Sequence, residues 1–181
     1  MNYFQYDKIA KQYDSFFCDD ESLSENDEVA SMLSEVKGKI YDLGCGTGLL
    51  TEILNIKPND YLGVDPSGEM LNKFLEKHPQ YLQRLVRNTF ERDGTPLRNY
   101  DWVVSLFGSI SYVDPKHLHR IEKEAKRYFL MFYKEDYHPV TYTMANVEFD
   151  HYHTSMTNLR SIFPTSKIEE YHNYVIVSKS V

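Results

Sequence analysis

The fold of this chain is decided by the stretch Ile40-Tyr41-Asp42-Leu43-Gly44-Cys45-Gly46-Thr47-Gly48-Leu49-Leu50. A short apolar run ends in an acidic residue, three glycines follow at alternating positions, and helix-forming residues begin directly afterwards. This order predicts a strand, a tight glycine loop and a helix. Glycines adopt backbone angles that other residues resist, and they let the main chain approach a ligand closely. The stretch therefore predicts a corner that binds a nucleotide-type cofactor.

The spacing of the glycines separates the classes of cofactor site. A dinucleotide fingerprint requires G-x-G-x-x-G, but Leu49 and Thr51 stand where its third glycine would fall. A P-loop requires a Gly-Lys-Ser/Thr ending, which this loop lacks. The run from Asp42 to Gly48 instead resembles motif I of the class I S-adenosylmethionine (SAM)-dependent methyltransferases. The resemblance implies SAM as the cofactor and methyl transfer as the activity.

A second motif lies at the distance that the first one predicts. The run Tyr61-Leu62-Gly63-Val64-Asp65 is another buried-strand pattern that ends in a carboxylate, 23 residues after Asp42. This is close to the spacing of the ribose-binding acid in a Rossmann-like unit. The alternative is that Asp65 only ends a strand or caps the helix that begins near Ser67. Its distance from the glycine loop favours ribose binding.

The resemblance to the methyltransferases implies a set of cofactor-binding residues. They are Tyr13, Asp42, Gly44, Cys45, Gly46, Gly48, Asp65, Pro66, Met70, Asn88, Thr89, Phe90 and Ser105. Asn88 stands where the family more usually has an Asp; its amide carbonyl can still accept a hydrogen bond from the exocyclic amine of adenine. For Phe90, stacking on adenine and packing in the core are equally good interpretations. Cys45 has the character of a small packing residue rather than of a nucleophile.

The order of the patterns predicts an α/β fold with a Rossmann-like, doubly wound, mostly parallel sheet. Buried-strand patterns near residues 40, 61, 85, 102 and 128 alternate with helical patterns. Two further strand patterns, separated by His172-Asn173, predict a C-terminal antiparallel hairpin. The length fits a single domain over residues 1–181. Within it, residues 1–37 form a helical lid or cap and residues 38–181 the core; in the family, an N-terminal Tyr-Asp segment of this type often closes over the cofactor.

Composition predicts an ordinary soluble, cytoplasmic protein. Hydrophobic residues make up 41% of the chain and charged residues 26%, and no apolar run approaches the length of a membrane span or signal peptide. Two cysteines are too few for a disulfide framework. The net charge of −7 and the lack of a basic stripe disfavour nucleic acid as a partner. Monomer and homodimer both remain open.

The segment after the fourth strand bears on the methyl acceptor. Amino-group DNA methyltransferases carry Asn or Asp followed by Pro-Pro-Tyr there, whereas this chain has Ser105-Leu106-Phe107-Gly108. This departure favours a small-molecule acceptor. Candidate general bases, if the acceptor must lose a proton, are His138 and His151, in or just after the loop that follows the fifth strand. We expect no metal site, because His151, His153 and Asp150 lack an independent fourth ligand.

Three alternatives to a small-molecule methyltransferase remain open at this stage. A non-catalytic module that binds SAM as a sensor or scaffold needs the same loop and the same Asp65. A methyltransferase that acts on nucleic acid or protein can use the same cofactor site. A nicotinamide oxidoreductase on a related sheet predicts NAD binding instead.

Overall fold

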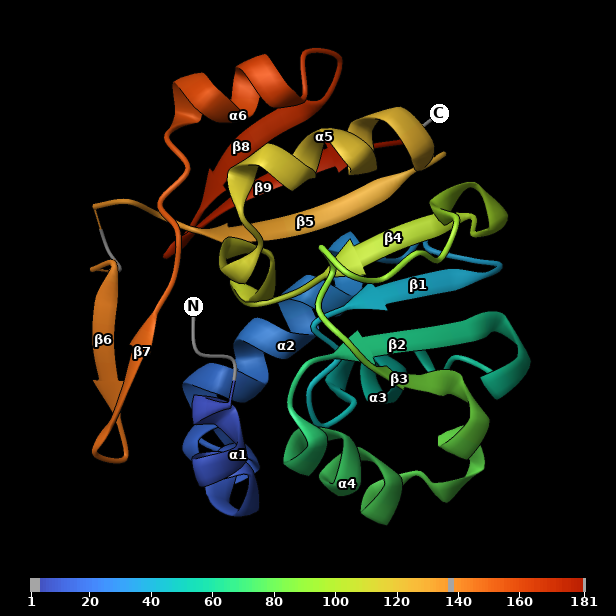
Figure 1. The fold of residues 1–181 in the computed structure, drawn as a ribbon, viewed down its shortest axis with the longest axis vertical. Helices are drawn as coiled ribbons and strands as arrows, with labels where there is room; N and C mark the ends of the chain where they lie inside the picture. The colour runs from blue at the N-terminus through green and yellow to red at the C-terminus, as the bar shows by residue number, and fades with distance from the viewer. Residues whose placement is uncertain (1–3, 137–138, 181) are drawn as a thin grey trace.

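The computed structural model describes residues 4–136 and 139–180. These residues form a seven-stranded sheet of order β3-β2-β1-β4-β5-β9-β8 and a separate two-stranded sheet, β6-β7 (Figure 1). The strands of the large sheet are β1 (Ile40–Leu43), β2 (Tyr61–Asp65), β3 (Leu85–Arg87), β4 (Trp102–Ser105), β5 (Tyr128–Tyr133), β8 (Lys167–Tyr171) and β9 (Tyr174–Lys179). β1 to β5 run parallel, whereas β9 runs antiparallel to β5 and β8. The predicted Rossmann-like fold with a C-terminal hairpin is confirmed.

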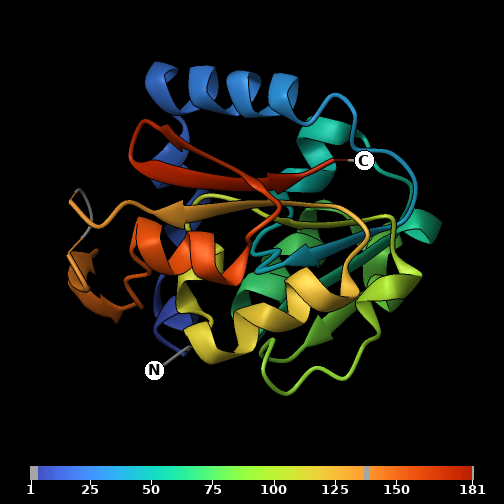
Figure 2. The ribbon, with the colours of Figure 1, turned by 90° about the horizontal axis from the view of Figure 1, so that it is seen from above.

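The central strands are buried because helices cover both faces of the sheet. All four residues of β1 and of β4 are buried, which explains why these strands are mostly apolar rather than alternating. One face carries α2 (Asp20–Met32), α3 (Leu49–Leu54) and α4 (Gly68–Lys77), and the other carries α5 (Pro115–Glu124) and α6 (Met156–Ile162) (Figure 2). Each face has its own apolar core. The core under α5 and α6 includes Leu118, Ile121, Leu159 and Ile162, and the core under α2 to α4 includes Val29, Leu33, Leu50 and Phe74.

Side-chain caps set the beginnings of α2 and α4. Asp19 accepts a hydrogen bond from the Ser22 amide at 2.8 Å and caps α2. Ser67 accepts from the Met70 amide at 3.1 Å and caps α4, which begins at Gly68, close to the start predicted near Ser67. The acidic first turns suit the positive ends of these helices.

The N-terminal segment, predicted to be a helical lid or cap, is only partly α-helical. An α-helix, α1 (Gln5–Ile9), continues as a 3-10 helix over Ala10–Phe17. In Figure 1, α1 lies between α4 and the β6-β7 hairpin. Further 3-10 turns occupy Pro58–Asp60, Pro79–Arg84, Leu97–Asn99 and Ser109–Tyr112.

The segment after β5 contains structure that the sequence did not predict. It forms an antiparallel hairpin of β6 (Thr141–Met144) and β7 (Val147–Asp150), followed by α6. The hairpin turns at Ala145 and Asn146, whose φ angles are 51° and 62°. Two successive left-handed residues match the right-handed twist of a hairpin, but alanine gives no sequence signal for such a turn.

Candidate active site

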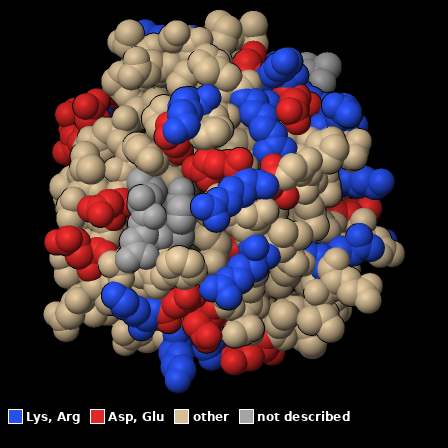
Figure 3. Space-filling model, in the orientation of Figure 1, with Lys and Arg blue, Asp and Glu red and all other residues tan. Residues whose placement is uncertain are grey.

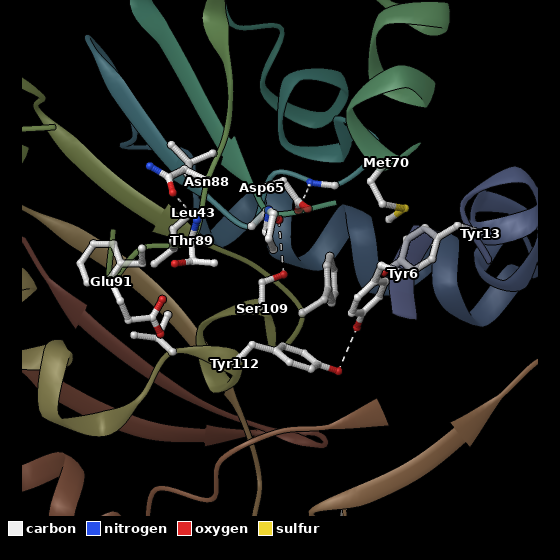
Figure 4. Close-up of a pocket in the computed structure, with 17 residues that line it drawn as sticks. Tyr6, Tyr13, Leu43, Asp65, Met70, Asn88, Thr89, Glu91, Ser109 and Tyr112 are labelled. Carbon is white, nitrogen blue, oxygen red and sulfur yellow. Dashed lines mark hydrogen bonds between the residues drawn. The ribbon is translucent and has the colours of Figure 1, made fainter. Parts of the chain in front are cut away.

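A cavity lies at the carboxyl ends of β1, β2 and β4, where ligands bind in open α/β sheets (Figure 4). The space between its walls, open solvent at its mouth included, is about 700 Å³. It is lined by Tyr6, Tyr13, Leu43, Gly44, Gly46, Val64, Asp65, Pro66, Met70, Asn88, Thr89, Phe90, Glu91, Phe107, Ser109, Tyr112 and Val113. The structure therefore brings together most of the residues that the sequence assigned to the cofactor.

The glycine loop forms the floor of the cavity between β1 and α3. Gly44, Gly46 and Gly48 have φ angles of 76°, 51° and 100°, the left-handed region that favours glycine. A Cβ atom on Gly44 would lie 2.5 Å from the Cβ of Ser109, and one on Gly48 would lie 2.9 Å from the Phe74 ring. Gly44 and Gly46 line the cavity, whereas Gly48 starts α3 outside it. The loop thus presents bare main chain to a ligand.

Asp65 ends β2 and points its carboxylate into the cavity. Its Oδ1 atom accepts a hydrogen bond from the Ser67 amide at 2.8 Å, and its Oδ2 atom accepts one from the Gly46 amide at 3.0 Å. Burial raises the pKa of Asp65 to about 6, while these two amide hydrogen bonds lower it. A carboxylate has about four acceptor positions. The two that remain beyond the amides match the two hydroxyls of a ribose, so this site fits an adenosyl group.

Asn88 and Thr89 lie at one end of the cavity, and Met70 lies toward the other end, near Tyr13 (Figure 4). Pro66 and Phe90 also line the cavity. The Oδ1 atom of Asn88 accepts a hydrogen bond from the Thr89 amide at 3.0 Å, which fixes the side chain. The Phe90 ring is 2% exposed and carries the Arg120 guanidinium 4.8 Å from its centroid. Much of the Phe90 ring surface is therefore already in contact with other side chains.

Four of the residues assigned to the cofactor lie outside the cavity lining. The Tyr61 hydroxyl donates to Asp42 Oδ2 at 2.6 Å, and the Ser105 hydroxyl donates to the Leu43 carbonyl at 2.8 Å. Cys45 is buried against Gly63, and Gly48 packs on the Phe74 ring. Burial raises the pKa of Asp42 to about 7; the Tyr61 hydrogen bond opposes this shift and the charge of Asp65 adds to it. Asp42, Cys45, Gly48 and Ser105 thus support the loop from below.

Sequence reasoning missed several lining residues. Glu91, Phe107, Ser109, Tyr112 and Val113 all line the cavity. The Ser109 hydroxyl lies 3.4 Å from the Gly44 carbonyl and donates to it. All five follow β3 or β4, so their place just beyond strand ends was the signal that could have identified them.

The N-terminal segment is attached over the cavity by two aspartates. Asp7 Oδ1 accepts hydrogen bonds from the Ser67 hydroxyl at 2.6 Å and from the Glu69 amide at 3.1 Å. Asp14 Oδ1 accepts from the Thr47 hydroxyl at 2.6 Å, and its Oδ2 atom pairs with Lys77 at 2.9 Å. Asp7 thus binds the start of α4, and Asp14 binds the glycine loop and the end of α4. Tyr6 and Tyr13, from the same segment, line the cavity.

Of the two histidines proposed as general bases, the structure describes only His151. His138 lies outside the described residues. His151 follows β7, is 2% exposed and is absent from the cavity lining. Its ring lies 4.8 Å from that of Tyr133 and 6.0 Å from that of Tyr112, measured between centroids. His151 therefore stands behind Tyr112, which lines the cavity.

Comparison with known proteins agrees with this geometry. Residues 40–129 match the family model described as a methyltransferase domain. No curated protein sequence matches the chain. Among solved structures, the CcbJ methyltransferase from Streptomyces caelestis superimposes with a TM-score of 0.75 at 13% identity, covering 98% of both chains.

Two further solved structures contain the cofactor. CalS10, an amino pentose methyltransferase from Micromonospora echinaspora involved in calicheamicin biosynthesis, was solved with SAM bound; it gives a TM-score of 0.64 at 13% identity, covering 86% of this chain and 89% of its own. Magnesium protoporphyrin IX methyltransferase (ChlM) from Synechocystis PCC 6803 was also solved with bound SAM. It gives a TM-score of 0.55 at 17% identity, covering 86% of this chain and 77% of its own. At these identities the likeness shows the fold alone.

Fold and site together define an α/β enzyme whose glycine loop and strand-end carboxylate fit an adenosyl cofactor. The chain belongs to the class I SAM-dependent methyltransferases, and SAM is its methyl donor. Residues 4–136 and 139–180 contain no group of three His, Cys, Asp or Glu side chains able to hold a metal ion. In the same ranges, no helix has the length and apolar character needed to cross a bilayer.

Proposed function

We propose that this methyltransferase acts on a small-molecule acceptor that enters the cavity beside Tyr6 and Tyr112. The observation that carries the proposal is the closure of this end of the cavity. Tyr6 comes from α1, Tyr112 from the turn after β4, and the hydroxyl of Tyr142, on β6, lies 2.6 Å from that of Tyr112. Three elements far apart in the sequence thus meet over the site. A space closed in this way suits a compact acceptor better than a polymer.

The proposed roles of the cofactor residues follow from their contacts. Asp65 accepts hydrogen bonds from the ribose hydroxyls, and Gly44 and Gly46 let the chain approach the methionine part. Asn88, Thr89 and Phe90 surround adenine, and Tyr13 covers the cofactor from the lid. SAM supplies an activated methyl group, so the protein's own task is to align the acceptor and exclude water. Closure by the N-terminal segment serves both purposes.

Surface charge supports a small acceptor over nucleic acid. The chain has 27 acidic and 20 basic residues. On the face drawn in Figure 3, the coloured Lys and Arg side chains are interspersed with Asp and Glu rather than joined in a continuous stripe. A protein that grips a phosphate backbone neutralises several phosphates along such a stripe. The low-identity match to an amino pentose methyltransferase also supports a small acceptor.

The test is methyl transfer from SAM with a labelled methyl group to matched acceptor panels. One panel holds small amines, alcohols, thiols, carboxylic acids and phenols; the others hold duplex DNA, tRNA and a protein extract. We expect label in one class of the small-molecule panel and none in the polymers. Label appearing first in a polymer would refute the proposal. So would SAM binding without label in any panel, which would favour the sensor or scaffold alternative.

A further inference from the structure

Three tyrosine hydroxyls form a hydrogen-bonded ring at the acceptor end of the cavity. The Tyr6 hydroxyl donates to the Tyr112 oxygen at 2.9 Å. The Tyr112 and Tyr142 oxygens are 2.6 Å apart, and the Tyr142 and Tyr6 oxygens are 3.2 Å apart. We call these three groups the hydroxyl ring. It joins the lid, the turn after β4 and the β6-β7 hairpin at one point.

The number of hydrogens in the hydroxyl ring decides whether it can donate hydrogen bonds to a ligand or only accept them. Each phenol has one hydrogen to donate and two lone pairs to accept with. Because Tyr6 donates to Tyr112, the three contacts are completed when Tyr112 donates to Tyr142 and Tyr142 donates to Tyr6. All three hydrogens are then used inside the ring. Toward a bound molecule the ring can therefore only accept hydrogen bonds.

The hydroxyl ring faces the same cavity as the cofactor residues. Tyr6 and Tyr112 line the cavity together with Gly44 and Asp65, whereas Tyr142 stands behind them. Figure 4 shows the Tyr6 and Tyr112 hydroxyls meeting at the end of the cavity away from Asn88 and Glu91. If Asn88 marks the adenine end, the hydroxyl ring marks the end where the acceptor meets the methyl group.

The surroundings of the hydroxyl ring are aromatic and suit a cation. Tyr13, whose ring lies 6.0 Å from that of Tyr6, and Phe107 also line the cavity. Outside the lining, the Phe149 ring lies 4.8 Å from that of Tyr6 and is stacked on that of Tyr142 at 5.3 Å. Aromatic faces attract positive charge, and quaternary ammonium groups are commonly bound in such cages. Burial raises the pKa of both Tyr6 and Tyr112. Their hydroxyls are therefore neutral at physiological pH and are poor proton acceptors for an alcohol.

We propose that the acceptor is an amine and that its nitrogen is the methylated atom, held by N–H hydrogen bonds to Tyr6 and Tyr112. This inference rests on the proposed small-molecule function. The nitrogen lone pair forms the new N–C bond while the C–S bond breaks and sulfur keeps that electron pair. The positive charge passes from sulfur to nitrogen within one aromatic enclosure, and the product ammonium releases a proton to solvent. Desolvation favours the neutral, nucleophilic amine.

Tyr142 acts as a positioning residue in this scheme. In Tyr142→Phe, the Tyr112 hydrogen loses its acceptor within the ring and becomes available to point at the ligand. The ring then offers a donor where the amine needs an acceptor. We expect the preference for an amine to fall by about 10-fold, the effect of roughly one net hydrogen bond. Cofactor affinity should stay within about 2-fold, because Tyr142 does not line the cavity.

The experiment uses three probes of matched shape: cyclohexylamine, cyclohexanol and cyclohexanecarboxylate. Each is titrated into the full chain saturated with S-adenosylhomocysteine, with binding followed by NMR of carbon-labelled tyrosine rings. We expect cyclohexylamine to bind about 10-fold more tightly than cyclohexanol and the carboxylate to bind most weakly. Tyr142→Phe should remove the preference. Tyr171→Phe should keep it, since that hydroxyl donates to Glu28 on the exposed edge at β8.

Several results would overturn the inference. They are equal binding of cyclohexanol, tighter binding of the carboxylate, no binding of the amine, or a preference that survives in Tyr142→Phe. If that variant does not fold, Tyr6→Phe breaks the same ring and has the same expected outcome. Binding is read without turnover, so it is independent of the acceptor panels. Label found only on alcohols would support the small-molecule function and refute the amine.

Discussion

At the scale of single residues, Asp65 carries the cofactor assignment. Its carboxylate is held by the Gly46 and Ser67 amides, which orient it toward the cavity before any ligand binds. Replacing Asp65 by Asn puts an amide nitrogen against one of these donors and removes the charge that ribose hydroxyls bind. We expect the Kd for S-adenosylhomocysteine to rise by about 10- to 100-fold, or about 1.5 to 3 kcal/mol.

Isothermal calorimetry measures this change, and circular dichroism checks that the fold is kept. Glu35→Gln is a matched control, because Glu35 is exposed and precedes β1 on the far side from the cavity lining. Its Kd should equal that of the wild type. An unchanged Kd in Asp65→Asn would remove the ribose role.

The buried carboxyl group of Asp42 leads to a prediction about the pH dependence of stability. Burial raises its pKa from 3.8 to about 7, so the native state binds this proton more tightly than the unfolded state. The contribution of Asp42 to the free energy of unfolding is therefore most favourable below about pH 4 and is lost as the pH rises toward 7. We compare the free energy of unfolding of Asp42→Asn with that of the wild type at each pH. The difference should favour the variant more at pH 8 than at pH 5, by on the order of 1 to 2 kcal/mol.

Urea denaturation of the wild type and the variant at both pH values measures this difference. In Asp42→Asn the Tyr61 hydroxyl can still donate to the amide oxygen of the new side chain, which keeps the local hydrogen bond. Glu35→Gln again serves as the control at an exposed position. Equal effects of Asp42→Asn at pH 5 and pH 8 would show that the carboxyl titrates normally in the native state.

At the scale of elements, the N-terminal segment acts through Asp14. The Thr47 hydroxyl and Lys77 both bind this side chain, one on the glycine loop and the other at the end of α4. Asp14→Ala removes both contacts while leaving Tyr6 and Tyr13 in place. We expect S-adenosylhomocysteine to dissociate about 3- to 10-fold faster, the effect of one net hydrogen bond, because the lid opens more often.

Stopped-flow displacement measures the dissociation rate. Lys11→Ala is the control, since Lys11 is exposed on the same segment. It should dissociate at the wild-type rate. If Asp14→Ala also keeps the wild-type rate, the segment does not limit release of the cofactor.

Much of the element order was predictable because strands of a parallel sheet have strong local signals. The runs ending in Asp42 and Asp65, and the apolar run over Tyr128–Tyr133, all became strands. The β6-β7 hairpin was missed because Ala145 occupies a turn position that normally holds Asn or Gly. The start of α2 has no comparable signal, because only the hydrogen bond from the Ser22 amide identifies Asp19 as its cap.

At the scale of the whole molecule, the chain brings together residues that no local pattern links. Gly44, Gly46 and Asp65 were predictable, since they lie in motifs with a known spacing. The hydroxyl ring was not, because Tyr6, Tyr112 and Tyr142 come from three elements and meet only through the fold. Sequence reasoning therefore identified residues at the end of the cavity that we propose binds the cofactor, while the structure was needed to bring together the residues of the proposed acceptor end.

The most direct test of the account is a crystal structure of the full chain with S-adenosylhomocysteine. We predict the two ribose hydroxyls within hydrogen-bond distance of Asp65, adenine beside Asn88, and the sulfur directed toward Tyr6 and Tyr112. An adenosyl group bound elsewhere, or a sulfur directed away from these tyrosines, would contradict the proposed cofactor and acceptor sites.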